Sequence, residues 1–228
     1  MKILLISDIH ANVDGLDIVL QKHADADRIL CAGDIVHYGL FPHETIAMLK
    51  AHNVRCVCGN HDLEMLRRAK EGVEAQEPGY VRYTLERLTA DDLRFLEALP
   101  RTYNFSADGV RYCMRHAYHV EELTNRFLLS VLDHDAIRAF DSRWERHADA
   151  PEAKTKCFLI GHSHTPSIVH VAEDRFVYNP GTLAFRLGKD ESDYAPVSCI
   201  VIEDGVPRIL HYDWDNTRTM WLRNSLDW

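Results

Sequence analysis

The sequence predicts an α/β protein that combines parallel and antiparallel strands. In the first third of the chain, apolar strand patterns alternate with amphipathic helix patterns, which is typical of parallel strands joined by crossover helices. After residue 103 the pattern changes to β-hairpins, with the turn dipeptides Asp108-Gly109 and Asp204-Gly205 between strand-like runs. We therefore expect a parallel sheet followed by antiparallel pairs.

Periodicity and turn signals place each element in order. Thr89 with Asp92 three positions later is typical of a helix start, and Pro78-Gly79 interrupts the helical pattern before it. The segment 63–99 either covers the sheet or forms a small cap. Because no repeat or linker is visible, we expect one domain over residues 1–228. The expected elements are strand 2–7, helix 13–23, strand 28–31, helix 43–52, strand 54–58, helical region 62–99, strands 102–107 and 110–115, helical region 120–147, strand 156–160, a strand pair around Glu173-Asp174, and strands 197–203 and 207–212.

Composition excludes several classes of protein. The 228 residues are 46% hydrophobic and 27% charged, as in an ordinary globular protein. A net charge of −9 argues against broad nucleic-acid binding, which needs clustered Lys and Arg. The first apolar run ends at Asp8, too short for a signal peptide or a membrane span, so the expected location is the cytoplasm.

The six cysteines could form disulfides or a zinc site. None of them forms a C-x-x-C pair, and each lies in or beside an apolar run. We therefore predict buried, reduced thiols.

Five short polar clusters each follow a predicted strand, and this shared position indicates a single site. In open α/β sheets the carboxyl ends of the strands are where ligands bind. Residues two apart, as in Asp8-x-His10 and His162-x-His164, point to the same side of an extended backbone. The clusters are Ser7-Asp8-Ile9-His10, Gly33-Asp34, Gly59-Asn60-His61-Asp62, His116 with His119, and Gly161-His162-Ser163-His164.

Carboxylates, an amide and imidazoles together form a donor set suited to Mn, Fe, Zn, Ni or Co. Any one cluster has an ordinary alternative: a surface loop produces D-x-H by chance, and the Gly-Asn-His-Asp stretch could be a turn with Asn60 in a left-handed conformation. Five clusters at five strand ends favour a metal site.

At these residues the sequence resembles the calcineurin-like metallophosphoesterase superfamily, and in particular its small single-domain bacterial and archaeal phosphodiesterases. The resemblance rests on "SDIHAN", "GDIVHYG", "GNHD", "MRHA", "GHSH" and the later "NPGT". It implies a four-layer sandwich of two mixed β-sheets flanked by helices. It also implies hydrolysis of a small-molecule phosphodiester or phosphomonoester by a metal-bridging hydroxide, with a histidine as general acid.

The resemblance also implies roles for individual residues. Two divalent ions, with manganese preferred, would share Asp34. His61 would donate the proton to the leaving group, and Asp62 would orient the turn or cap the following helix. The implied ligands are Asp8, His10, Asp34 and His164 for one ion, and Asp34, Asn60, His116 and His162 for the other. His119 competes with His116 for its place.

Some positions depart from the pattern. Protein phosphatases of the superfamily have an Asp and an Arg where this chain has His37 and Tyr38, which argues against that activity. His37, Tyr38 and His43 follow Asp34 and could line the mouth of the site, and Arg186 could contact a substrate phosphate.

Other activities stay open. A nucleotidase or pyrophosphohydrolase is one alternative, and a protein-binding scaffold like the retromer subunit of this fold is another, although such scaffolds lack the histidine found here as His61. The aromatic C-terminus, with Trp214, Trp221 and Trp228, could pack on the core or form a contact between subunits in a homo-oligomer.

Overall fold

The computed structural model describes residues 1–72, 79–117, 156–172, 175–184 and 196–213. Within these ranges the chain forms strands and helices in an order close to the expected one. The strands are β1 (Lys2–Ile6), β2 (Arg28–Cys31), β3 (Arg55–Cys56), β4 (Tyr103–Ala107), β5 (Val110–Met114), β6 (Cys157–Leu159), β7 (Ser167–Ala172), β8 (Arg175–Asn179), β9 (Val197–Glu203) and β10 (Val206–Tyr212). The helices are α1 (Val13–Lys22), α2 (Pro42–Ala51), α3 (Asn60–Glu71), α4 (Gly79–Arg87) and α5 (Ala90–Glu97).

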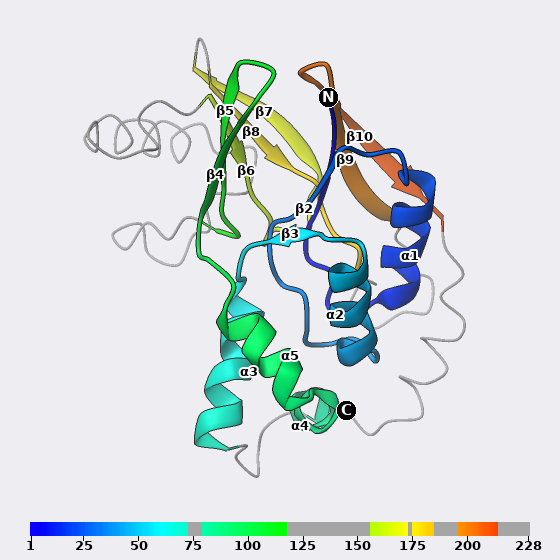
Figure 1. Ribbon diagram of the computed structural model, residues 1–228, viewed down its shortest axis with the longest axis vertical. Coiled ribbons are helices and arrows are strands. Elements are labelled where there is room, and N and C mark those ends of the chain that lie inside the picture. The colour runs from blue at the N-terminus through cyan, green and yellow to red at the C-terminus, as the bar shows by residue number, and fades with distance from the viewer. Residues whose placement is uncertain (73–78, 118–155, 173–174, 185–195, 214–228) are drawn as a thin grey trace, which may run out of the picture.

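Two mixed five-stranded sheets form the centre of the fold (Figure 1). The first has the order β10-β9-β1-β2-β3, in which β1, β2 and β3 are parallel and β9 and β10 are antiparallel additions. The second has the order β4-β5-β6-β8-β7, in which β5, β6 and β8 are parallel. The two-sheet fold that the resemblance implied is therefore confirmed.

Strand β1 shows why the molecule has layers. Its side chains alternate between two apolar cores, so both faces are buried and the strand reads as a continuous apolar run. Ile3 and Leu5 pack between the two sheets, with Tyr112 of β5 and Leu159 of β6. Leu4 packs on the opposite face in the core shared with the helices.

The helices cover the outer face of the first sheet. In α1 the apolar side chains recur at helical spacing, and Asn12 caps the helix by accepting from the backbone N–H of Gly15 at 3.2 Å. The expected start of α5 is confirmed: the hydroxyl of Thr89 accepts from the N–H of Asp92 at 3.2 Å, and the carboxylate of Asp92 accepts from the N–H of Thr89 at 2.9 Å.

The segment after β3 forms three helices at the end of the sheets opposite the N-terminus (Figure 1). Helix α3 contacts α4 and α5, and α4 contacts α2. Met65, Val81 and Leu96 join the same core as the outer face of the first sheet. These helices therefore extend the existing helical layer around that core.

Several other expectations can be compared with the described residues. Both Asp-Gly turns have positive φ at each residue, as two-residue hairpins require, and all six cysteines are free and buried. The predicted helical region 120–147 and the three C-terminal tryptophans lie outside the described residues. No helix in the described part of the chain is long and apolar enough to cross a membrane.

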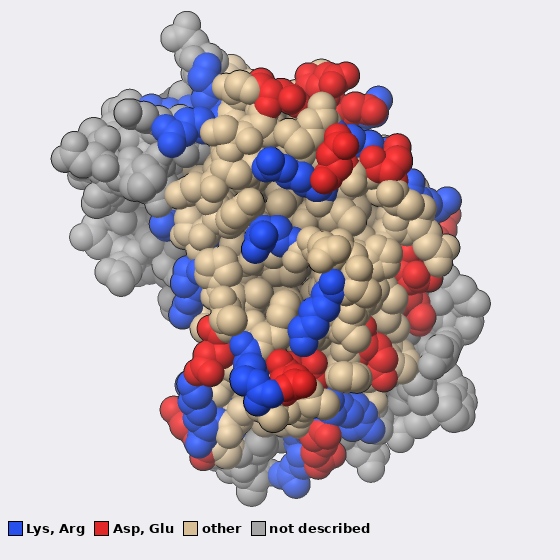
Figure 2. All heavy atoms as spheres, in the orientation of Figure 1, with Lys and Arg blue, Asp and Glu red and all other residues tan. Residues whose placement is uncertain are grey.

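The visible surface carries charges of both signs. On the face shown in Figure 2, separate Lys and Arg side chains lie across a mostly uncharged central area, and most Asp and Glu side chains lie nearer its edges. The Lys and Arg side chains do not gather into a continuous basic surface there, which agrees with the net charge of −9.

Candidate metal centre

The five polar clusters come together because the two sheets end side by side. Asp8 and His10 follow β1, Asp34 follows β2, and Asn60 follows β3 as the first residue of α3. The remaining histidines follow the parallel strands β5 and β6 of the second sheet. The carboxyl ends of both sheets thus supply one cluster of side chains, as the strand-end positions predict.

The backbone of these loops differs from the expected extended form. Asp8, His10, Asp34, His162 and His164 all have positive φ, between 47° and 73°. The argument that extended backbone aligns residues two apart was therefore wrong. Left-handed turns instead bend each loop. They bring Asp8 and His10 to the same group of donor atoms, whereas His162 and His164 reach two neighbouring groups. Asn60, in contrast, is helical, so its alternative as a left-handed turn residue is also wrong.

Left-handed residues cost free energy and persist only where the surroundings hold them. The loops after β1 and β2 are joined by the backbone bonds from the N–H of Asp8 to Gly33 O at 2.9 Å and from the N–H of His10 to Asp34 O at 3.0 Å. The hydroxyl of Thr182 donates to Asp8 O at 2.7 Å. These bonds hold the strained residues in position.

The "NPGT" stretch proves to support the site. Asn179 Nδ2 donates to Gly161 O at 2.9 Å and to Ser163 Oγ at 3.0 Å, which joins the end of β8 to the loop after β6. Thr182 makes the bond to Asp8 described above. Sequence reasoning noted this motif only as part of a resemblance and assigned it no contact. The signal available was its position directly after a strand.

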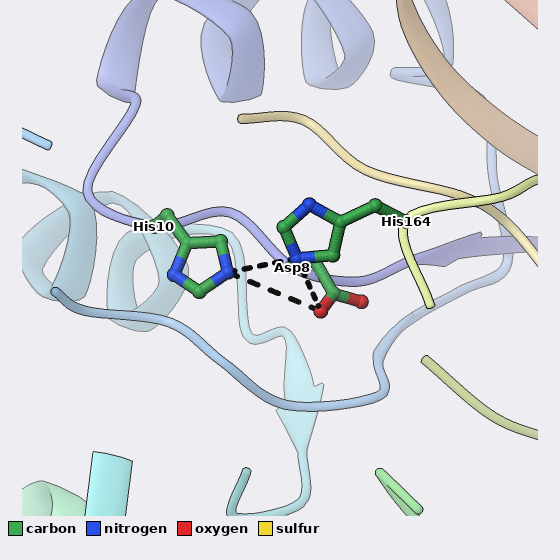
Figure 3. Close-up of side chains that lie close together, drawn as sticks. All are labelled: Asp8, His10 and His164. Atoms are coloured by element: carbon green, nitrogen blue, oxygen red, sulfur yellow. Dashed lines mark hydrogen bonds and ion pairs between the residues drawn. The ribbon is translucent and has the colours of Figure 1, made fainter. Parts of the chain in front are cut away.

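Asp8, His10 and His164 form the first donor group (Figure 3). Their side chains converge, with His10 Nε2 3.1 Å from His164 Nε2 and His164 Nε2 3.2 Å from Asp8 Oδ1. His10 Nε2 lies 4.0 Å from the same Asp8 oxygen. Asp8 itself is oriented by the backbone N–H of His162, which donates to both carboxylate oxygens at 3.1 and 2.8 Å.

Asn60, His116 and His162 meet in a second donor group around Asp34. Asn60 Oδ1 lies 3.0 Å from His116 Nε2 and 2.7 Å from His162 Nδ1. His116 Nε2 lies 3.2 Å from His162 Nδ1 and 3.0 Å from Asp34 Oδ2. Four donor atoms therefore face one small volume.

Asp34 lies between the two groups. Its Oδ2 is 3.0 Å from His116 Nε2 of the second group and 3.9 Å from His10 Nε2 of the first. Its Oδ1 accepts from the backbone N–H of His61 at 2.9 Å. A Cβ on Gly59 would overlap this same oxygen, so the close approach requires glycine.

The donor spacing fits a divalent ion. Two nitrogen or oxygen ligands about 2.0–2.1 Å from one metal, at roughly 90–109° to each other, lie about 2.9–3.4 Å apart. Most of the close pairs in both groups lie within that range, at 3.0 to 3.2 Å, and the pair Asn60 Oδ1–His162 Nδ1 is shorter, at 2.7 Å. His116 Nδ1 is 2.8 Å from Ala32 O, to which its N–H donates, so Nε2 is the ring nitrogen that faces the other donors.

The buried carboxylates and imidazoles of the site stabilise one another's charged forms. Burial acts to raise the pKa of Asp34. The charge and hydrogen bond of His116, with smaller effects from His10 and His61, are stronger than this effect and hold the pKa well below its ordinary value. Burial acts to lower the pKa of His116, but Asp34 and Asp8 raise it to about 9. Burial lowers the pKa of His10 and of His162 to about 4, so both are neutral at pH 7, as metal ligands must be.

His61 stands beside this cluster with its own partner. Its Nε2 is 4.0 Å from Asp34 Oδ2, and its Nδ1 is 2.6 Å from Nδ1 of the buried His37. Tyr38 places its ring against His10 and His61, and Tyr80 of α4 contacts both His37 and Tyr38.

Three other predicted residues are placed elsewhere or not described. His43 lies on α2, where its Nδ1 is 2.8 Å from Asp92 Oδ2 at the start of α5. Arg186 and His119 lie outside the described residues.

Asp62 accepts from the N–H groups of Gly59, Ile35 and Val36 at 2.9 to 3.1 Å, so it orients the turn before α3 as expected.

The two-sheet fold and a histidine–aspartate cluster at the strand ends define a metal-binding α/β protein. Residues 1–200 match the calcineurin-like phosphoesterase superfamily domain, and the chain belongs to this superfamily. Members usually bind divalent metals, which agrees with the clusters described above.

Individual proteins resemble this chain in sequence or in fold. An uncharacterized protein of Methanocaldococcus jannaschii is 26% identical over 200 residues, covering 79% of this chain and 75% of that protein. A metallophosphoesterase from Sphaerobacter thermophilus has a similar structure, with a TM-score of 0.72, 23% identity, and coverage of 99% of this chain and 94% of that one. A hypothetical protein from Pyrococcus horikoshii also has a similar structure, with a TM-score of 0.78 and 13% identity. The match covers 98% of this chain and 92% of that one. At these identities the two structures show the fold alone.

Proposed function

We propose that the protein is a dinuclear metal-dependent phosphoesterase that hydrolyses a small-molecule phosphodiester or phosphomonoester. The observation that carries this proposal is the position of Asp34 between two groups of donor atoms. The histidine and carboxylate donor atoms within each group lie within 4.8 Å of one another. Membership in a superfamily of phosphoesterases supports the reaction class.

Each ion is assigned four protein ligands. Asp8, His10, Asp34 and His164 hold one, and Asp34, Asn60, His116 and His162 hold the other. His61 also lies near His10 and Asp34 and could be taken for a ligand. We leave it out because its Nδ1 is engaged by His37 and because the family resemblance gives it the role of proton donor.

When bound, two divalent ions would supply positive charge against the carboxylates of Asp8 and Asp34, activate water and stabilise charge on the phosphate. Manganese is the preferred ion because the donor set mixes oxygen with several imidazoles. Iron, zinc, nickel and cobalt suit the same donors.

His61 donates the proton to the departing alkoxide from Nε2. A protonated His61 has a second N–H at Nδ1, and this group needs an acceptor. His37 provides one at 2.6 Å, and burial lowers the pKa of His37 to about 3, so its ring stays neutral and can accept. His37 thus orients His61, and general acid catalysis of this kind contributes roughly 10² to 10⁴ in rate.

Hydrolysis assays test the proposal. Metal-stripped protein is reconstituted with Mn, Ni, Co, Zn or Mg and assayed on p-nitrophenyl phosphate and bis-p-nitrophenyl phosphate. We expect turnover that depends on metal and is lost in Asp34→Asn and His61→Ala. His52→Ala is the matched control because His52 is an exposed histidine at the end of α2.

The faster of the two probes decides between diester and monoester, and we expect the diester. His61→Ala should keep its bound metal, since His61 is assigned no ligand role. No turnover with any ion, although two ions bind, would contradict the proposal and favour a binding scaffold of the same fold. A nucleotide panel separates the nucleotidase and pyrophosphohydrolase alternatives.

A further inference from the structure

A cavity of about 320 Å³ opens next to the second donor group. Asn60 and His116, both assigned as ligands, form part of its wall. The opposite lining comes from the segment that leads into β4 and from the end of β5, with Arg101, Thr102 and Arg115. The cavity therefore borders both the proposed reaction centre and two arginines that the metal site does not use.

The charge of this cavity is opposite to that of the chain. Two arginines line it, and among the lining residues that the structure describes none is Asp or Glu, although the whole chain carries a net charge of −9. Asn60, at the cavity wall, is also the first residue of α3, so the positive end of a twelve-residue helix lies there. An anion in the cavity would thus meet favourable charge from three elements.

The arginines are held by contacts around the cavity. Arg115 is half-buried, and its Nε donates to Thr102 Oγ1 at 2.6 Å. Arg101 is exposed, but its neighbour Pro100 accepts from the backbone N–H of Cys58 at 2.9 Å. That bond joins the segment before β4 to the turn before α3. The position of both arginines beside Asn60 therefore follows from backbone and side-chain bonds.

We propose that this cavity binds a second phosphate group of the substrate, one that is not hydrolysed. The inference rests on the proposed function and specifies its substrate class: a phosphoester with an additional phosphate, such as a nucleoside bisphosphate derivative. Guanidinium groups match phosphate oxygens in geometry and charge. A cavity of about 320 Å³ accommodates a group of that size.

A matched pair of substrates tests this inference. Thymidine 5′-(p-nitrophenyl phosphate) and its 3′-phosphorylated derivative release the same chromophore and differ only in one phosphate. With metal-loaded enzyme we expect the 3′-phosphorylated compound to have the lower KM. Arg101→Gln should raise that KM by about tenfold, the loss expected for one hydrogen bond to a charged group, and leave the KM of the other compound within about twofold.

Two further variants complete the design. Arg115→Lys keeps a cation but loses the planar pair of donors, and it should raise the same KM without a change in kcat. Arg111→Gln on β5 is the control because Arg111 is exposed and does not line the cavity. Equal effects of Arg101→Gln on both compounds, or no effect on either, would overturn the inference even if both are hydrolysed.

A binding measurement separates this inference from the proposed function. Calorimetry compares thymidine 3′,5′-bisphosphate with thymidine 5′-monophosphate on the metal-loaded protein. Tighter binding of the bisphosphate that Arg101→Gln abolishes supports the cavity even without turnover, in which case only the proposed function fails. Equal binding of both nucleotides, together with hydrolysis of the simple probes, rejects only the cavity.

Discussion

His37 and His61 face each other through their Nδ1 atoms at 2.6 Å. His37 lies in the loop after β2, whereas His61 lies in the first turn of α3. His37 is 4% exposed, whereas the side chain of His61 is 22% exposed. A buried, neutral ring thus holds a more accessible ring beside Asp34, and this arrangement makes His37 a positioning residue for the proposed proton donor.

Replacement of His37 tests that role in kinetics. His37→Ala removes the acceptor for Nδ1–H of His61, so we expect kcat to fall by about tenfold to a hundredfold while KM and metal content stay unchanged. His37→Asn places an oxygen near the lost nitrogen and should restore most of the rate. Steady-state kinetics over pH 5–9 provides the measurement. Equal losses in Ala and Asn variants, or lost metal in either, would indicate a purely structural role.

The stability of the metal-free protein should depend on pH through His37. Burial lowers its folded pKa to about 3, below the unfolded value of about 6.5, with His61 and His10 acting in the same direction. The unfolded chain therefore binds more protons below pH 6.5, and stability falls as the pH drops toward 3. In His37→Asn the decline should be shallower by up to about 1.4 kcal/mol per pH unit. Urea unfolding between pH 6.5 and 4.5 measures both slopes, and parallel curves would refute the prediction.

Asp34→Asn should weaken metal binding while the protein still folds. The change keeps the shape of the side chain but removes the negative charge between the two donor groups. We expect metal affinity to fall by at least about tenfold, because a carboxylate ligand is lost and its attraction for cations with it. Metal analysis after dialysis gives the result. Asp25→Asn is the control, since Asp25 is an exposed carboxylate paired with Lys2. Full retention of both ions by Asp34→Asn would exclude the shared-ligand assignment.

Gly59 should tolerate no side chain, for a reason of space. Its φ of −91° is ordinary for any residue, but an added Cβ would overlap Asp34 Oδ1 and press on the Asp34 backbone. Gly59→Ala is expected to cost about 1–3 kcal/mol of stability and to weaken metal binding. At Gly72 an added Cβ would meet no described atom within 4 Å, but the φ of 90° at this position would strain an alanine. Gly72→Ala should therefore cost about 1 kcal/mol and leave metal binding intact, as thermal unfolding and metal titration will show.

Local sequence signals determined much of the fold. Strand β2 has the expected bounds. Strand β1 and helix α1 end one residue earlier than expected, and helix α2 begins and ends one residue earlier. The Asp-Gly hairpins and the capped start of α5 depend on residues close in sequence, so periodicity and turn chemistry suffice for them. Strand β3 is shorter than expected, at two residues, and α3 begins earlier, at Asn60. Element ends depend on neighbours distant in sequence, which the local pattern does not contain.

The sequence by itself also indicated which side chains gather at the candidate metal centre, because side chains at the carboxyl ends of strands are carried to one edge whatever the loop details. Only the tertiary structure decided how they meet. It placed Asp8 and His164 in left-handed turns rather than extended backbone, paired His37 with His61, and brought Arg101 and Arg115 beside Asn60. Those relationships join segments from two sheets and a helix. Sequence spacing does not encode the distance between such segments, because the packing of the two sheets sets it.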